Sequence, residues 1–206
     1  DAMDHSAVNR QFVADLLAVC PAPRHVLDVG TGNALIPIEL CGRVPDCRVT
    51  AADLSLAMLQ QARRRIEAAA LAARIELARS DAKQMHYRDG TFDLVVCNGT
   101  LHHFADPSVV LRESLRVTAP GGWIFFRDLQ RPDDFDALER FVASFAGEAS
   151  ACGQQLYRQS LQAALTRDEM RAATERGADV LRQGADIGSG AASHIQHHAG
   201  WAAFDE

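Results

Sequence analysis

The sequence predicts an α/β fold in which a doubly wound, mostly parallel sheet lies between helices. Strand-like and helix-like segments alternate through the first two-thirds of the 206 residues, which is typical of β-α-β units. Residues 94–97 are apolar without a break, as expected of a strand that is covered on both faces. From residue 133 to 177 the pattern becomes wholly helical. We therefore expect a single domain over 1–206, with a helical cover formed by its C-terminal third.

The N-terminal segment is expected to be a helix over about 6–19. Its apolar residues recur at three- and four-residue intervals: Val8, Phe12, Leu16 and Val19. Pro21 and Pro23 end it. Residues 25–30 are the first predicted strand. A helix follows from about Ala34, and Pro37 must then fall in its first turn, where proline is tolerated.

Four further strands are predicted after this helix, at 47–53, 74–82, 92–100 and 123–129. Ser55 is placed to cap a helix between the first two of them, because a serine side chain can accept a hydrogen bond from the first turn. A helix over about 108–117 and a turn at 119–122 precede the last strand. These segments, at about 24–130, form the expected core.

The helical cover, 133–177, divides into three pieces. Thr166 and Glu169 have the spacing of a capping box at the start of the last piece, and Gly177 is a plausible stop. Residues 178–206 contain four glycines and only short apolar clusters, so we expect an irregular tail with short strands. If this tail does not complete the sheet, the sheet edge must be covered by another chain or left exposed, and we therefore consider a homodimer.

Composition argues against several classes of partner. The formal net charge of −6 does not suit a nucleic-acid backbone, which needs clustered basic residues. The run of arginines at 63–65 is interpreted as a solvated helix face rather than a basic patch. No apolar stretch is long enough to span a membrane, and no signal peptide opens the chain. Five cysteines without a C-x-x-C pair fit a cytoplasmic location better than a disulfide framework or a zinc site.

Three carboxylates, Asp28, Asp53 and Asp81, fall near the ends of three successive predicted strands. In doubly wound sheets, ligands bind outside the carboxyl ends of the strands. Gly30 and Gly32 follow the first strand and would let the backbone turn sharply beside a ligand. A glycine turn alone is also compatible with a tight strand-to-helix connection that binds nothing.

The spacing disfavours a dinucleotide site. The fingerprint G-x-G-x-x-G requires a glycine where this chain has Leu35, and Asp28 would repel a pyrophosphate but could orient a cationic ligand. Asp53 is placed to accept the hydroxyls of a ribose, and Asp81 to accept the amine of an adenine. Because no Tyr-x-x-x-Lys pair is present either, a nicotinamide-dependent oxidoreductase is the weaker alternative.

Five segments resemble, in order and spacing, motifs of the class I S-adenosylmethionine-dependent methyltransferases, especially the small-molecule and quinone C-methyltransferases. They are VLDVGTGNA, AADLS, RSDAKQM, FDLVVCNGTLHHF and LRVTAPGGWIFFRDL, within about 24–130. The resemblance implies the Rossmann-like fold of that family and S-adenosyl-L-methionine as cofactor. It implies that the methionyl part of the cofactor lies against Gly30, Thr31 and Gly32, and that Asp53 holds the ribose. By the same resemblance, Leu54 and Met58 pack near adenine, and Asp81 with Ala82 contacts the amine edge of that ring. Asn98 and Gly99 would face the reaction centre. Ala34 stands where the family has a third glycine.

The resemblance implies methyl transfer to a small-molecule acceptor by in-line displacement. His102 and His103 follow Asn98, so one of them is a candidate general base or acceptor-orienting group, and packing or turn capping is the alternative. Nucleic-acid methyltransferases that act on amino groups carry the motif N-P-P-[FY] at the end of the fourth strand. This chain has NGTL at that position, so that class is rejected. A non-catalytic cofactor-binding or regulatory protein remains the other open reading.

Two other groups of residues are interpreted from position. Phe141, Phe145 and Tyr157 in the helical cover are candidates for the wall of an acceptor pocket, with core packing as the alternative. At the N-terminal side, the segment containing Val8, Asn9, Arg10 and Phe12 is expected to close the cofactor cleft. We expect no metal site: the histidines of the segment HIQHH, at 194, 197 and 198, have no cysteine or carboxylate at ligand spacing beside them.

Overall fold

The structure, a computed structural model, describes the backbone of residues 6–184 and the side chains of residues 7–178. The strands are β1 (His25–Val29), β2 (Arg48–Asp53), β3 (Ile75–Arg79), β4 (Phe92–Asn98) and β5 (Thr118–Arg127). The helices are α1 (Ser6–Val19), α2 (Leu35–Arg43), α3 (Leu56–Ala68), the short 3-10 helix η1 (Leu101–His103), α4 (Pro107–Val117), α5 (Phe135–Ala146), α6 (Ala151–Ala163) and α7 (Arg167–Gly184).

The five strands form one sheet in the order β3-β2-β1-β4-β5, and every pair within it is parallel. The chain builds outward from β1 to β3, then crosses back to lay β4 on the other side of β1. Strand order therefore reverses between β1 and β4, which is where doubly wound sheets bind ligands. The predicted fold class is confirmed.

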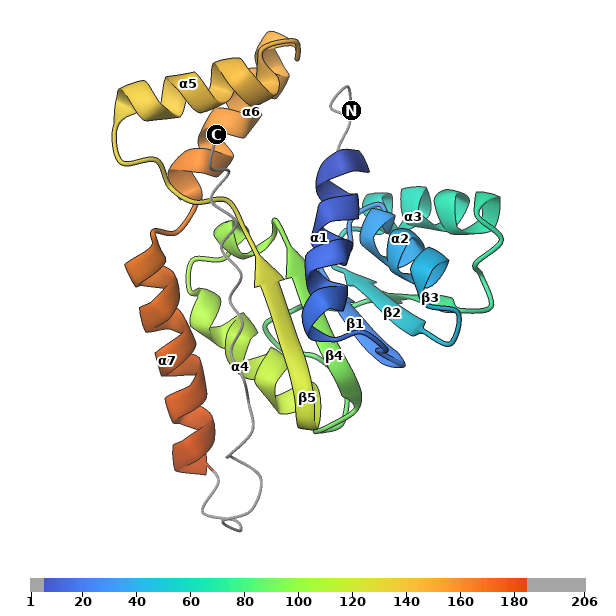
Figure 1. Cartoon of the computed structure of the whole chain (residues 1–206). Coiled ribbons are helices and arrows are strands. Elements are labelled where there is room, and N and C mark those ends of the chain that lie inside the picture. Colours follow the sequence, from blue (N-terminus) through green and yellow to red (C-terminus); the bar gives the residue numbers. More distant parts are fainter. Residues whose placement is uncertain (1–5, 185–206) are drawn as a thin grey trace.

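Helices cover both faces of this sheet (Figure 1). On one face α1, α2 and α3 pack through a core that includes Phe12, Leu40 and Ile66. On the other face α4 and α7 pack through a second core that includes Leu111 and Met170. Because both faces are buried, the strands need no alternation of polar residues, which explains the unbroken apolar run of β4.

Predicted caps are found at two helices. The Ser55 hydroxyl accepts the N–H of Met58 at 3.3 Å and caps α3. Before α7, Glu169 Oε2 accepts the N–H of Thr166 at 2.8 Å, and the Thr166 hydroxyl accepts the N–H of Glu169 at 3.2 Å. Both capping predictions are confirmed.

The fifth strand begins earlier than predicted. Thr118 pairs with Phe92, whereas the next pair is Trp123 with Leu94, so residues 119–122 bulge out of the ladder. Gly121 has a φ of 76°, which glycine adopts without strain. The predicted turn is thus a bulge inside β5, because the residue before it already pairs with β4.

The predicted end of the last helix at Gly177 is wrong. α7 continues to Gly184, so residues 178–184 are helical instead of part of an irregular tail. Gly177 is buried against α4, where a Cβ would lie 3.3 Å from the Ser108 carbonyl oxygen, the Arg112 nitrogen and the Leu111 Cβ. Its role is therefore close helix packing, not termination. The short strands predicted after residue 184 lie outside the described residues.

Replacing Gly177 with leucine is expected to destabilise the protein by about 1–3 kcal/mol, because the side chain must force α7 away from α4. For a chain of this size that lowers the melting temperature by roughly 2–12 °C. The matched control is Gly42→Leu in α2, since a Cβ at Gly42 meets nothing within 4 Å. Thermal unfolding of both variants checks this, and equal melting temperatures would contradict the packing role.

α5 and α6 form the helical cover and lie beyond the carboxyl end of β5 (Figure 1). They pack on each other through a small cluster of Leu138, Val142 and Leu161. The cover is thus held mainly by its own contacts and by the segment that follows β5. Among residues 6–184 no helix is both long and apolar enough to cross a membrane.

Candidate functional site

The loop between β1 and α2 folds against the end of β2. Gly30 and Gly32 have φ angles of 71° and 55°, a region that glycine occupies readily. The N–H groups of Gly30 and Thr31 both donate to the Ala52 carbonyl, each at 2.9 Å. A Cβ at Gly32 would meet nothing within 4 Å, so a ligand could lie directly against the backbone there.

Asp53, the last residue of β2, is oriented by two backbone donors. Its Oδ2 accepts the N–H of Gly32 at 2.8 Å, and its Oδ1 accepts the N–H of Ser55 at 2.8 Å. A carboxylate offers about four lone-pair sites, so both oxygens keep capacity for a ligand. Leu54 and Met58 lie beside it with 56% and 41% of their surface exposed, which supplies an apolar platform next to the acid.

Asp28 is only 3% exposed, and its Oδ2 has no hydrogen-bond partner among the described residues. Burial raises the pKa of Asp28 to about 7; the Thr31 hydroxyl opposes the rise and the negative charge of Asp53 adds to it. An unpartnered buried carboxyl oxygen at the rim of a pocket is suited to a cationic or hydrogen-bond-donating ligand.

The raised pKa of Asp28 gives a pH-dependent prediction. Because the folded-state pKa lies above the usual 3.8, ionising Asp28 costs stability, and this cost is absent below about pH 4 and complete above about pH 7. Asp28→Asn is therefore expected to raise the melting temperature of the ligand-free protein by on the order of 10 °C at pH 8. At pH 4 the gain should disappear.

The control for Asp28→Asn is Asp46→Asn, which removes an exposed carboxylate outside the pocket. Thermal unfolding at the two pH values checks the prediction. A gain of the same size at both pH values, or a gain shared with the control, would show that ionisation of Asp28 is not its source.

Asp81 lies just beyond β3 at the same edge of the sheet. Its Oδ1 accepts the N–H of Lys83 at 2.9 Å and pairs with the ammonium of that lysine at 3.0 Å. These bonds, the backbone one first, lower the pKa of Asp81. The carboxylate is thus held in place while its second oxygen stays available to a donor.

Between these acids and the histidines lies the end of β4, with Asn98, Gly99 and Thr100. A Cβ on Gly30 would come within 2.4 Å of the Thr100 methyl group, so Gly30 is required by packing against Thr100. Gly99 has a φ of 68° and open space at its Cβ position. Sequence reasoning missed Thr100, because threonine after a strand carries no motif of its own.

His102 is held by a buried carboxylate that the sequence analysis did not identify. Its Nδ1 lies 2.6 Å from Asp128 Oδ1, and its backbone N–H donates to Asp128 Oδ2 at 3.1 Å. The two side chains are 5% and 2% exposed. Asp128 directly follows β5, so a fourth acid at a strand end was a signal that could have revealed it.

His103 lies against His102, with ring centroids 4.0 Å apart. Burial, then the neighbouring His102, lower the pKa of His103, while Asp128 opposes the change. Among the described residues no carboxylate bonds its ring. The structure therefore separates the two candidate bases: His102 has an orienting carboxylate and His103 has none.

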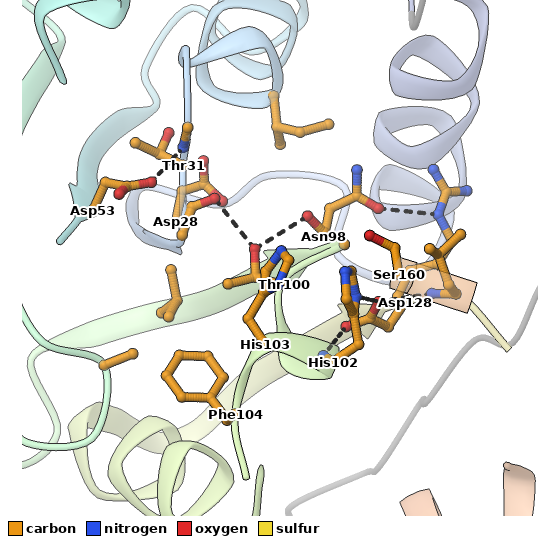
Figure 2. A pocket seen from close by; sticks show the side chains of 18 of the residues that line it. Asp28, Thr31, Asp53, Asn98, Thr100, His102, His103, Phe104, Asp128 and Ser160 are labelled. Carbon is orange, nitrogen blue, oxygen red and sulfur yellow. Dashed lines mark hydrogen bonds and ion pairs between the residues drawn. The ribbon is translucent and has the colours of Figure 1, made fainter. Parts of the chain in front are cut away.

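One pocket of about 830 Å³ connects all of these groups. It is lined by every one of the predicted site residues: Asp28, Gly30, Thr31, Gly32, Asp53, Leu54, Met58, Asp81, Ala82, Asn98, Gly99, His102 and His103. Figure 2 shows Asp53 and Thr31 at one end, and His102, Asp128 and Ser160 at the other. All of these residues thus lie around one pocket, and the role of each of them stays a prediction.

The predicted walls differ in part from those found. Phe141, Phe145 and Tyr157 of α5 and α6 do line the pocket. At the N-terminal side Val8 and Asn9 line it as well, but Arg10 and Phe12 do not. Phe12 points into the core, where it is 0% exposed.

Arg127, at the end of β5, holds α1 against the pocket, where α1 forms part of the wall. Its Nη2 donates to the Val8 carbonyl at 3.0 Å, its Nε donates to Asn98 Oδ1 at 3.4 Å, and its guanidinium lies 4.7 Å from the centre of the Phe12 ring. Cation–π contacts of this kind contribute about 0.5–2 kcal/mol. Arg127 therefore joins the N-terminal helix to the end of β4.

Comparisons with known proteins find similar chains. A family model described as a methyltransferase domain matches residues 27–126. A demethylmenaquinone methyltransferase of Deinococcus radiodurans is 36% identical over 115 residues, which are 56% of this chain and 47% of that protein. A malonyl-[acyl-carrier protein] O-methyltransferase of Legionella pneumophila is 35% identical over 118 residues, 57% of this chain and 40% of that protein. Residues 27–126 are therefore similar to methyltransferase domains.

A solved methyltransferase shares the fold. Phosphoethanolamine N-methyltransferase 2 of Haemonchus contortus, in complex with S-adenosyl-L-methionine, matches with a TM-score of 0.63 at 19% identity, covering 81% of this chain and 36% of that one. This chain spans less than half the length of the two curated relatives.

Three features of the pocket fit S-adenosyl-L-methionine, the cofactor that the sequence resemblance implies. Asp28 has an unpartnered buried oxygen, the backbone of Gly32 has open space beside it, and Leu54 is an exposed apolar side chain next to Asp53. The Asp28 oxygen suits a cationic group of the cofactor, and the open space at Gly32 suits a chain packed against the backbone. Leu54 suits the flat adenine ring, with the ribose at Asp53. Where the family has its third glycine, Ala34 adopts a left-handed φ of 63° and is 0% exposed, so its methyl group packs in the core and does not line the pocket.

Proposed function

We propose that this protein transfers a methyl group from S-adenosyl-L-methionine to a small-molecule acceptor. The observation that supports this most strongly is the geometry of Asp53, whose two oxygens are oriented by Gly32 and Ser55 beside the exposed Leu54 and Met58. A nucleoside held there would direct the rest of the cofactor along the Gly32 backbone toward Asn98.

Each end of the pocket has a separate task in this proposal. The acids Asp28, Asp53 and Asp81 bind and orient the cofactor, whose sulfonium supplies an already activated methyl group. The cover residues from α5 and α6 exclude water and position the acceptor. Orientation of this kind can supply on the order of 7–11 kcal/mol of the barrier at best. His102 holds or removes the acceptor proton, a contribution of roughly 10²- to 10⁴-fold.

Calorimetric titration with S-adenosylmethionine, S-adenosylhomocysteine and NADH tests the binding half of the proposal. Saturable binding of the first two compounds and none of NADH is the expected result. The oxidoreductase alternative predicts the opposite pattern. Cofactor binding without transfer to any acceptor would favour a non-catalytic binding protein.

Location and assembly belong to the proposal too. All five cysteines are unpaired and four of them are buried, which supports a reducing compartment such as the cytoplasm. The homodimer and the absence of nucleic-acid partners stay predictions, and light scattering during gel filtration tests the first.

A further inference from the structure

The buried His102–Asp128 pair restricts the chemistry of the acceptor, given the methyl-transfer function proposed above. A carboxylate can only accept hydrogen bonds, so the 2.6 Å contact places a proton on His102 Nδ1. Neutral imidazole then has its lone pair on Nε2. No hydrogen bond among the described residues involves Nε2, and His102 lines the pocket.

Asp128 uses three of its roughly four acceptor sites to hold this arrangement. Its Oδ1 also accepts the N–H of Leu129 at 2.7 Å, and its Oδ2 accepts the backbone N–H of His102. With 2% exposure, it has little capacity left for an ammonium ion in the pocket. Its geometry serves the orientation of the imidazole.

The pocket also disfavours an anionic acceptor. Five aspartates line it (Asp28, whose pKa is raised to about 7, with Asp53, Asp81, Asp128 and Asp133), against two guanidinium groups. Both arginines already have partners: Arg127 bonds Val8 and Asn98, and Arg131 pairs with Glu169 at 3.0 Å. A negatively charged acceptor would be repelled by these aspartates, and no unpaired arginine among the described residues lines the pocket to offset the repulsion.

The wall that faces the acceptor is largely aromatic and apolar. Phe141 and Phe145 on α5 stack with ring centroids 6.0 Å apart and an interplanar angle of 18°. Tyr157 and Leu161 line the pocket from α6, and Ser160 lies near the histidine pair (Figure 2). Flat rings suit a flat, apolar acceptor body.

We infer that the site takes an aromatic hydroxyl compound, that His102 Nε2 is the base that receives its proton, and that Asp128 is the positioning residue for His102. In the balanced step the acceptor O–H bond breaks and its proton goes to Nε2. The new bond to the methyl carbon forms at the oxygen or at a conjugated ring carbon. The methyl–sulfur bond breaks with its electron pair left on sulfur, and the imidazolium later releases its proton to water.

A tautomer measurement tests the role of Asp128 without any turnover. Long-range ¹H–¹⁵N correlation spectra of histidine-labelled protein at pH 8 should show His102 with protonated Nδ1, the signal being assigned by its loss in His102→Gln. In Asp128→Asn this preference should be lost, while Asp136→Asn, an exposed acid on α5, should keep it. A wild-type His102 protonated on Nε2 would overturn the inference.

A matched acceptor set tests the substrate class: 2-naphthol, 2-naphthoic acid and 2-naphthylmethylamine carry a hydroxyl, a carboxylate and an ammonium on one ring system. Methyl transfer to 2-naphthol alone is expected, with at least about a 100-fold loss of turnover in Asp128→Asn. Affinity for S-adenosylhomocysteine, titrated on the same preparations, should stay unchanged.

Other outcomes of this assay contradict the inference. Equal or faster transfer to the acid or the amine would overturn the acceptor class, as would no transfer to 2-naphthol by protein that binds S-adenosylhomocysteine. Full turnover in Asp128→Asn would remove Asp128 from the reaction. Failure to bind S-adenosylhomocysteine at all would instead count against the proposed function, so the two failures are distinguishable.

Discussion

Asp53→Ala is expected to weaken the binding of S-adenosylhomocysteine by at least about 100-fold. Hydrogen bonds to a charged group contribute about 1.5–3 kcal/mol each, and the Asp53 carboxylate is placed to accept two from a ribose. The variant also removes the acceptor for the N–H of Gly32, so the loop beside the ligand loses its anchor. Calorimetric titration measures the change.

The control for this prediction is Asp46→Ala, which removes an exposed carboxylate from the turn before β2. Asp53→Asn should fall between the two, because its amide oxygen can still accept one bond. If Asp53→Ala bound the ligand as tightly as Asp46→Ala, the ribose role would be wrong.

His102→Ala is expected to lower turnover on 2-naphthol by roughly 10²- to 10⁴-fold, with cofactor affinity within about twofold of the wild type. The reason is the loss of the only described base that a buried carboxylate orients in this pocket. His103→Ala should cost less than about tenfold, because the structure gives its ring no such partner. Initial rates together with titrations separate the chemical step from binding.

A surface histidine provides the comparison, since His86 is exposed and does not line the pocket. His86→Ala should leave turnover unchanged. Added imidazole should restore part of the activity of His102→Ala if a proton acceptor is what that variant lacks. Wild-type turnover in His102→Ala would exclude the histidine as base.

Much of the core could be predicted because each signal was local. The apolar run of β4, the Ser55 cap and the Thr166–Glu169 box each depend on a few neighbouring residues, and all three are found. Gly177 could not be interpreted locally, because the same residue that ends helices also permits close helix packing. Only the contact with α4 distinguishes the two.

The candidate site divides in the same way. Asp28, Asp53 and Asp81 could be placed from strand ends, since parallel strands finish at one edge of a sheet. Asp128 could not be linked to His102 from the sequence, because 26 positions separate them and only the pairing of β5 with β4 brings them together. The burial of Asp28, and hence its raised pKa, also required the packed structure.

The most direct test of the central claim is a crystal structure with S-adenosylhomocysteine. The ribose hydroxyls are expected to lie within hydrogen-bond distance of Asp53, and the sulfur is expected on the Asn98 side of the pocket, facing His102. A nucleoside bound elsewhere, or bound here with its ribose away from Asp53, would contradict this claim.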